Sequence, residues 1–154
     1  MQKKFIKRGE KQEREFEQKI IDLARVTRVT AGGKQLNFRA CVAIGDLKGR
    51  CGIGLAKGVD VAIAVEKAAT VAKKKIITVS ITKEESIPYE IQEKFGAARI
   101  LLKPAKKGTG LKAGSAVRIV LELAGIKNIT SKIFGSNNKI NNAKATINAL
   151  SKFK

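Results

Sequence analysis

The residues best suited to chemistry lie in one short segment that is rich in hydrogen-bond donors. It combines basic side chains, hydroxyl groups and a Gly-Gly pair, in Arg25, Thr27, Arg28, Thr30, Gly32, Gly33 and Lys34. Guanidinium, ammonium, hydroxyl and glycine amide groups donate hydrogen bonds to phosphate and ribose oxygens. Gly-Gly loops also occur in many ordinary hairpins, so the pattern needs support from the rest of the chain. Arg50 and Lys57, in the next glycine-rich segment, complete the predicted contact set.

Catalysis is disfavoured by what the chain lacks. It contains no histidine, so a Ser/His or Cys/His nucleophile and a histidine-bearing zinc site are impossible. Carboxylates are few, with 13 Asp+Glu against 32 Lys+Arg, and Glu122 is the only one after residue 98. No carboxylate pair is therefore available there for acid–base or metal chemistry. We expect a protein that is not an enzyme, with no cofactor and no metal.

Three further motifs fail when their spacing is checked. Gly52-x-Gly54 lacks the third glycine of a dinucleotide-binding loop, and the segment 108–112 (GTGLK) lacks the Gly-Lys-Ser/Thr of a P-loop. Cys41 and Cys51 could face each other across a hairpin, but two cysteines without histidine do not complete a structural zinc site. We predict that both are buried small apolar residues.

The net charge of +19 favours a polyanionic partner, either a nucleic acid or an anionic membrane surface. No apolar run approaches the roughly 18 residues of a spanning helix. The predicted helix at 61–75 carries Ala and Val rather than large apolar anchors, which argues against a membrane surface. The N-terminus is too charged for a secretion signal, so we expect a cytosolic protein.

The charge is unevenly spread and predicts two modules. Residues 25–75 hold eleven basic and three acidic residues, whereas residues 76–98 hold two basic and four acidic ones. Residues 99–154 return to twelve basic residues and a single acid. We predict a basic tail over 1–19, a first domain over 20–77 and a second domain over 78–154.

Hydrophobic periodicity predicts the elements of the first domain. Strands are expected at 20–30, 35–44 and 50–56, followed by an amphipathic helix at 61–75 that starts after Asp60. The third strand has one face nearly bare of side chains, which favours a closely packed helix over a ligand phosphate. This β-β-β-α order is that of double-stranded-RNA-binding domains.

The second domain is predicted to be α+β, in the order β-α-β-α. Strands are expected near 76–81, at 99–103 and at 126–134, with helices over 113–124 and after Asn138. Because strands and helices alternate, the helices should cover one face of a single sheet.

Four blocks carry a resemblance to a known family. They are RVTRVTAGGKQLNFRACVAIGD (25–46), GRCGIGLAKGVDVAIAVEKA (49–68), FGAARILLKPAKKGTGLKAGSAVRIVLELAGIKNI (95–129) and GSNNKINNAKATINAL (135–150). In this order and spacing they resemble the bacterial-type small-subunit ribosomal protein five. The family usually has Gly at Ala56, His at Tyr89 and Pro at Lys139.

The resemblance implies a fold, a function and partners. It implies a double-stranded-RNA-binding-like N-terminal domain, a C-terminal α+β domain and a place in the small ribosomal subunit. Family members bind small-subunit rRNA, contact small-subunit proteins four and eight, and support assembly and translational accuracy. Messenger RNA (mRNA), where it enters the ribosome, is a further candidate partner. The loop matching 27–34 reaches rRNA, and the region of Gly108, Gly110 and Arg118 lies near the protein-four interface.

Two other functions remain open from the residues alone. A free-standing RNA-binding regulator outside the ribosome has the same composition and fold, and is disfavoured only by the length of the resemblance. An RNA-modifying enzyme is the second alternative, because folds like the second domain also occur in enzymes. The scarcity of acids in that domain argues against it.

Overall fold

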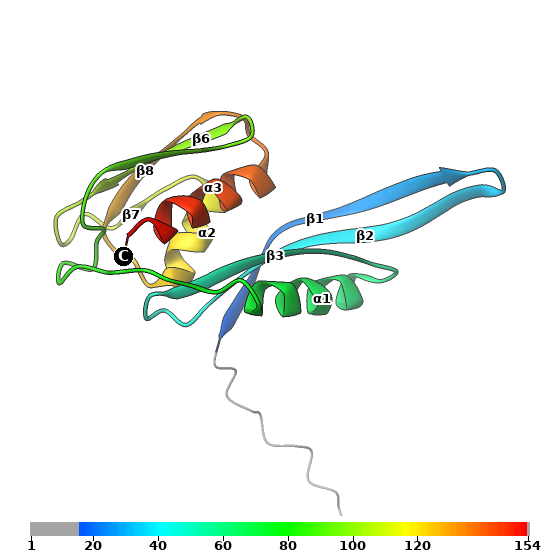
Figure 1. Ribbon diagram of the computed structural model, residues 1–154, viewed down its shortest axis with the longest axis horizontal. Helices are drawn as coiled ribbons and strands as arrows, with labels where there is room; N and C mark the ends of the chain where they lie inside the picture. The colour runs from blue at the N-terminus through cyan, green and yellow to red at the C-terminus, as the bar shows by residue number, and fades with distance from the viewer. Residues whose placement is uncertain (1–15, 154) are drawn as a thin grey trace, which may run out of the picture.

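The computed structural model of the protein describes residues 16–153, which form two four-stranded sheets and three helices (Figure 1). The basic tail predicted over 1–19 lies mostly outside this range, and residues 17–19 already belong to the first strand. The first sheet has the order β1-β2-β3-β4 and the second the order β5-β6-β8-β7. The elements are β1 (Glu17–Thr30), β2 (Gly33–Gly45), β3 (Arg50–Gly58), α1 (Val61–Lys73), β4 (Ile77–Thr78), β5 (Ile91–Phe95), β6 (Ala98–Pro104), β7 (Leu111–Lys112), α2 (Ser115–Ala124), β8 (Ile129–Gly135) and α3 (Lys139–Ser151).

A long hairpin of β1 and β2 is the most prominent feature of the first sheet. The two strands pair from Glu17 opposite Gly45 to Thr30 opposite Gly33, with one irregularity between Ile20 and Asp22. Strand β3 pairs with β2 only between Phe38 and Gly45. Residues 26–37 therefore run on without a third strand, as a two-stranded ribbon that projects away from the rest of the molecule (Figure 1).

Helix α1 packs directly on the glycine face of β3. A methyl group added to Gly54 would lie 2.0 Å from the carbonyl oxygen of Ala68, and one on Gly58 would lie 2.7 Å from the amide nitrogen of Ala64. Small residues on both elements thus let the two backbones approach. The predicted helix and its close packing on this bare face are confirmed. Asp60 caps the helix by accepting a hydrogen bond from the Val61 amide at 2.7 Å.

The second domain buries the other face of the first sheet. From Ala40 to Gly45, every residue of β2 is buried. Ala40, Val42 and Ile44 pack with α1, whereas Cys41 and Ala43 join the core of the second domain. The alternation of apolar residues at 35–44 predicts a half-buried strand, with one face buried and the other exposed. That prediction is wrong for residues 40–45, because the second face is covered by residues distant in the sequence.

Both cysteines are buried and free, as predicted. They do not face each other across the hairpin, since Cys41 lies opposite Leu55 and Cys51 opposite Gly45. Burial raises the pKa of the Cys41 thiol to about 11 and that of Cys51 to about 12. Such thiols stay protonated near neutral pH and behave as small apolar side chains.

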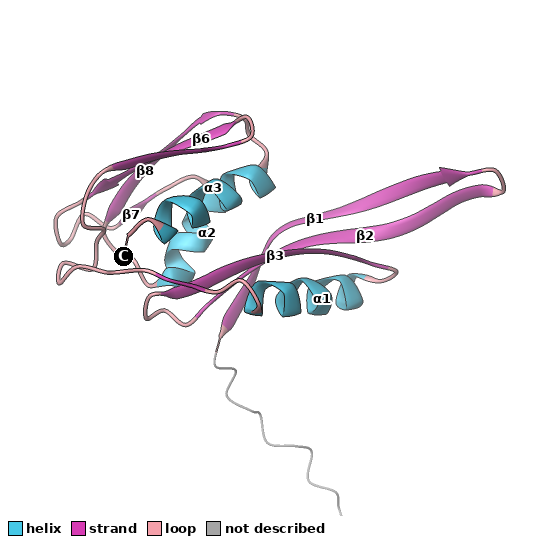
Figure 2. Ribbon diagram, viewed as in Figure 1, coloured by secondary structure: helices cyan, strands magenta, loops and turns pink. Residues whose placement is uncertain are grey.

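The second sheet carries α2 and α3 on one face, which confirms the predicted α+β class (Figure 2). The strand expected near 76–81 in the second domain is β4, which pairs with β3 in the first sheet instead, so that placement is wrong. The structure also adds two strands that the sequence analysis did not predict. Strand β5 lies within the acidic stretch, where Ile91, Glu93 and Phe95 alternate with exposed residues. Strand β7 has two residues and runs parallel to β8. Helix α3 begins at Lys139, and the Asn138 side chain caps it through the Ile140 and Asn141 amides.

The turn between β2 and β3 joins the two halves of the molecule. The amides of Leu47 and Gly49 donate to the carbonyl oxygens of Leu123 and Ala124, at 3.1 and 2.9 Å. These carbonyls end α2 and have no partner within the helix. A methyl group on Gly45 would lie 2.1 Å from the Leu123 oxygen, so the backbones are in direct contact. The domain boundaries at 20–77 and 78–154 stay predictions.

Candidate nucleic-acid interface

The hairpin ribbon presents the predicted contact residues on both of its faces. Residues that are directly opposite in the register point to the same face. Arg25 pairs with Phe38 and Thr27 with Leu36, so they and Lys34 share the face that α1 covers nearer the core. Arg28 and Thr30 point to the opposite face. Basic side chains therefore lie on both faces of the hairpin.

The ribbon is exposed from residue 27 to residue 36, and only Val26 and Asn37 at its base are half-buried. All the predicted residues from Arg25 to Lys34 are exposed, and the apolar side chains of Val29 and Leu36 remain 74% and 51% exposed. The Thr30 hydroxyl donates a 3.0 Å hydrogen bond to the Gly33 carbonyl and closes the turn. No heavy atom of the described residues lies within 4 Å of a methyl group built on Gly32 or Gly33. The backbone at the tip is thus open to a ligand.

Lys57 and Arg50 lie apart from the tip of the hairpin. Lys57 is exposed near the base of the ribbon, opposite Arg39 in the neighbouring strand. Arg39 was not predicted, and its guanidinium lies 3.6 Å from the Asp22 carboxylate. The alternation of apolar residues predicts only that Arg39 points outward from its strand. The structure brings Lys57 close to the hairpin but places Arg50 at the far end of β3.

Arg50 instead belongs to the β2–β3 turn. Its Nε donates to the Asp46 carboxylate at 2.6 Å, and its guanidinium carbon lies 5.0 Å from the centre of the Phe16 ring. Burial alone would raise the pKa of Asp46. Hydrogen bonds from the Arg50 side chain and from the Lys48 and Arg50 amides outweigh burial and lower this pKa below its ordinary value.

Gly108 and Gly110, predicted to lie at a protein interface, are held by a residue that the sequence analysis missed. The buried side chain of Asn128 accepts hydrogen bonds from the Gly108 and Gly110 amides at 3.1 and 3.2 Å. Its amide group donates to the Glu84 carbonyl at 2.8 Å. The only signal in the sequence is an amide side chain between Lys127 and Ile129, which does not identify its partner.

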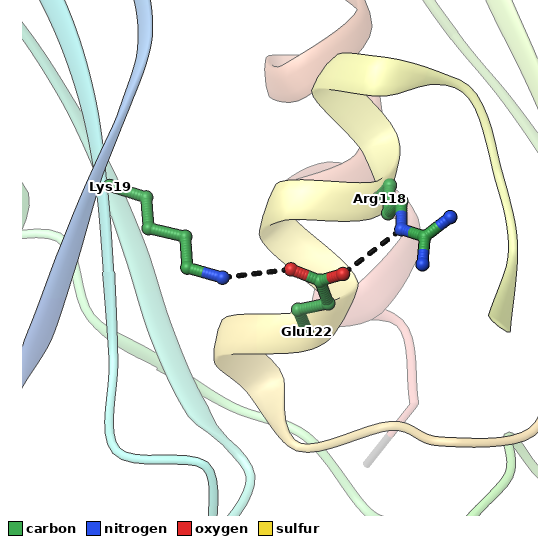
Figure 3. Close-up of polar contacts among 3 residues, drawn as sticks. All are labelled: Lys19, Arg118 and Glu122. Carbon is green, nitrogen blue, oxygen red and sulfur yellow. Dashed lines mark hydrogen bonds and ion pairs between the residues drawn. The ribbon is translucent and has the colours of Figure 1, made fainter.

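Arg118 is held in place by a bridge between the two domains (Figure 3). The Glu122 carboxylate accepts from Arg118 Nε at 3.0 Å along α2, and from Lys19 Nζ of β1 at 2.8 Å. Hydrogen bonds from Lys19 and Arg118 lower the pKa of Glu122. The Arg118 side chain remains 55% exposed, so its guanidinium can contact another molecule while the hydrogen bond to Glu122 holds its orientation.

Within residues 16–153, no group of three His, Cys, Asp or Glu side chains could hold a metal ion. The described helices include none that is long and apolar enough to cross a membrane. The one acid of the last third of the chain, Glu122, is engaged by two cations. What the exposed groups offer chemically is a set of cationic and neutral hydrogen-bond donors.

Comparisons with known proteins match both halves of the chain. The family described as "Ribosomal protein S5, N-terminal domain" matches residues 16–80, and "Ribosomal protein S5, C-terminal domain" matches residues 93–154. A relative from Emiliania huxleyi, named small ribosomal subunit protein uS5c, is 53% identical over 89% of this chain and 86% of its own length. Small ribosomal subunit protein uS5 from Nostoc punctiforme is 46% identical over 97% of this chain and 85% of its own length.

Proposed function

The chain belongs to the ribosomal protein S5 family of structural proteins of the small ribosomal subunit, and we propose that within that subunit it binds small-subunit rRNA through the β1–β2 hairpin. Family membership also confirms that the protein is ribosomal and is not an enzyme. The observation that carries the proposal is the exposed ribbon at 26–37, which has basic side chains on both faces.

The ribbon is suited to the RNA backbone rather than to base edges. Arg25 and Lys34 on one face and Arg28 on the other can neutralise phosphates of two RNA segments at once. Thr27 and the open glycine amides at the tip add neutral hydrogen bonds to phosphate and ribose oxygens. The ribbon residues include no aromatic side chain for stacking on single-stranded bases. Recognition is therefore of RNA shape and charge.

Salt dependence of binding tests this role of the hairpin. Each phosphate contact contributes about 0.7 to 0.9 to the slope of log affinity against log salt. The double variant Arg28→Ala and Lys34→Ala should reduce the slope with a small-subunit rRNA transcript by about 1.5. The matched control, Lys48→Ala and Lys83→Ala, removes the same charge from exposed turns and should leave it nearly unchanged. An unchanged slope in the hairpin variant would contradict the proposal.

The proposal extends to the neighbours of the protein in the subunit. Gly108, Gly110 and Arg118 form a protein interface that contacts small-subunit protein four, and protein eight is a second neighbour. Support comes from the 108–110 loop, which is hydrogen-bonded to Asn128, and from the exposed guanidinium of Arg118, which is hydrogen-bonded to Glu122. The proposal also includes mRNA near the point where it enters the ribosome, together with roles in subunit assembly and translational accuracy.

The accuracy role predicts a change in miscoding. Arg118→Ala should alter the misreading of a reporter codon by ribosomes that carry the variant, because it removes an exposed charge at the interface. Lys83→Ala, which removes an exposed charge from the turn after β4, serves as the control. Quantifying the variant protein in purified subunits ensures that incorporation is equal. Normal misreading at equal incorporation would remove support for this interface.

A further inference from the structure

Within residues 16–153, no helix or strand covers one face of the second sheet. Helices α2 and α3 lie on its other side (Figure 2). Strand residues alternate strictly between the two faces. Ala98, Ile100 and Leu102 of β6 are buried toward the helices. We call the opposite surface the open face, and its strand positions are Gln92, Lys94, Arg99, Leu101, Lys103, Lys112, Thr130, Lys132 and Phe134.

Five of these nine positions are basic and none is acidic. The acid of strand β5, Glu93, points toward α3 and pairs with Lys152 there. Glu90, just before β5, lies 3.3 Å from Lys103 at the edge of the face. Among residues 16–153, no carboxylate is within ion-pair distance of the remaining four cations, Lys94, Arg99, Lys112 and Lys132.

The register gathers these cations into one patch. Lys94 lies opposite Arg99, Leu101 opposite Lys132, and both Lys103 and Lys112 are neighbours of Thr130. Neighbouring strands are about 4.8 Å apart, and alternate residues along a strand are about 6.7 Å apart. Like charges so closely spaced repel one another, and among the described acids only Glu90, beside Lys103, offsets this repulsion. A bound polyanion removes that repulsion.

The composition of the patch selects RNA over a protein partner. The central parts of protein interfaces are depleted of lysine and enriched in apolar side chains. Here four lysines and an arginine surround only Leu101, which is half-buried, and Phe134, which is 38% exposed. Phe134 lies opposite Arg99 in the register, and both side-chain types stack on bases or riboses.

We propose that the open face is a second RNA-binding surface, which docks the sugar–phosphate backbone of a folded RNA segment distinct from the one at the hairpin. It rests on the proposed function, because the RNA is that of the small subunit. Lys94, Arg99, Lys103, Lys112 and Lys132 neutralise phosphates, and Phe134 packs against a ribose or an unstacked base.

The first test removes charge from the open face. The triple variant Lys94→Gln, Arg99→Gln and Lys132→Gln should reduce the salt slope for a small-subunit rRNA transcript by about 2 to 3, and the affinity at about 100 mM salt by about tenfold or more. Binding to a duplex RNA of about 20 base pairs, longer than the roughly 16 that a double-stranded-RNA-binding domain spans, should fall as well. All three residues are exposed, so the unfolding transition should not move.

A matched control decides whether the effect belongs to this surface. Lys67→Gln, Lys73→Gln and Lys74→Gln remove the same charge from the exposed side of α1 and the residue that follows it. The inference predicts that this control variant lowers the salt slope by less than half as much as the open-face variant does. An equal decrease of the salt slope in both triple variants would mean that the open face acts only through the general positive charge of the protein. That result would overturn the inference. No loss in the open-face variant would do the same.

Combining the variants separates this inference from the proposed function. The hairpin pair and the open-face triple lie on different sheets, so their effects on log affinity should add. A loss confined to the open-face variant supports this surface while contradicting the role of the hairpin. A loss of RNA affinity confined to the hairpin variant supports the role of the hairpin and contradicts the role of the open face. If the open-face variant keeps its RNA affinity but releases a neighbouring protein from purified subunits, the surface is a protein interface and the inference is wrong.

Discussion

At the scale of single residues, the structure separates glycines that are needed for packing from those that are needed for access. Gly54 allows α1 to reach β3, because a methyl group there would lie 2.0 Å from the Ala68 carbonyl oxygen. Gly32 lies at the tip of the hairpin, where a methyl group would meet nothing within 4 Å. The same side-chain type thus serves stability in one place and ligand approach in the other.

This contrast gives a paired prediction on stability. Gly54→Ala should lower the free energy of unfolding by about 2 kcal/mol, because overpacking forces the helix and strand apart. Gly32→Ala should change it by less than about 0.5 kcal/mol, since the position is exposed and open. Urea unfolding followed by circular dichroism measures both. Equal effects in the two variants would mean that the contact between α1 and β3 is looser than described.

Glu122 predicts a pH dependence of stability. Its pKa is lowered in the folded protein from 4.5, so its stabilisation is fully present above that value and is lost as the pH falls through the lower folded pKa. Glu122→Gln should therefore be less stable than the parent protein at neutral pH, and the difference should vanish at acidic pH. Asp46 titrates in both proteins and cancels from the comparison. A stability difference that does not depend on pH would exclude the ionic bridge.

At the scale of elements, the sequence predicts the strands and helices whose apolar residues recur at regular spacing within one segment. Strands β1, β2 and β3 and helix α1 follow from alternation, from helical spacing and from Asp60 as a cap. Strand β5 was missed because its inward position at Glu93 is charged, and only Lys152, far along the chain, makes that acceptable. Strand β7 has two residues, too few to show any period.

The candidate site was predicted unevenly for the same reason. Arg25, Arg28 and Lys34 are close together in the sequence and remain so in the fold. Arg39 and the open face depend on the register between strands, and Asn128 depends on hydrogen bonds to loops far away in the sequence. No local pattern reveals either. Arg50 matched the expected residue type, but its engagement by Asp46 depends on how the β2–β3 turn folds.

The hairpin ribbon predicts that binding and stability can be separated at the level of an element. Replacing residues 27–36 with Asn-Gly would join Val26 to Asn37, which are opposite each other, through a two-residue turn. Because the removed residues are exposed, the free energy of unfolding should change by less than about 1 kcal/mol. Affinity for a small-subunit rRNA transcript should fall at least as far as in the double variant at Arg28 and Lys34. Undiminished affinity would rule out the hairpin as the main contact.

At the scale of the whole molecule, the two sheets share one apolar core. Ile21, Cys41 and Cys51 of the first sheet belong to the same apolar cluster as α2 and α3. The β2–β3 turn completes the hydrogen bonding of the last carbonyls of α2. Cooperative unfolding is usual for small single domains.

We therefore expect a single unfolding transition. Tyr89 is the only tyrosine of the chain, which has no tryptophan. The centre of the Tyr89 ring lies 5.0 Å from that of Phe153, so tyrosine fluorescence reports on the second half of the molecule. Gly54→Ala acts in the first half, yet it should shift the Tyr89 transition and the circular dichroism transition equally. Two separate midpoints would show that the halves unfold independently.

The unsupported ribbon at 26–37 also affects newly made copies of the protein. Within the described residues, no further strand pairs with either outer edge of this ribbon, and the apolar side chains of Val29 and Leu36 are exposed among the basic ones. An unpaired strand edge is a template for self-association, which basic side chains restrain only in part. Copies produced in excess of their RNA should therefore be short-lived or prone to precipitate, so the cell gains from keeping their synthesis in step with transcription of the nucleic acid.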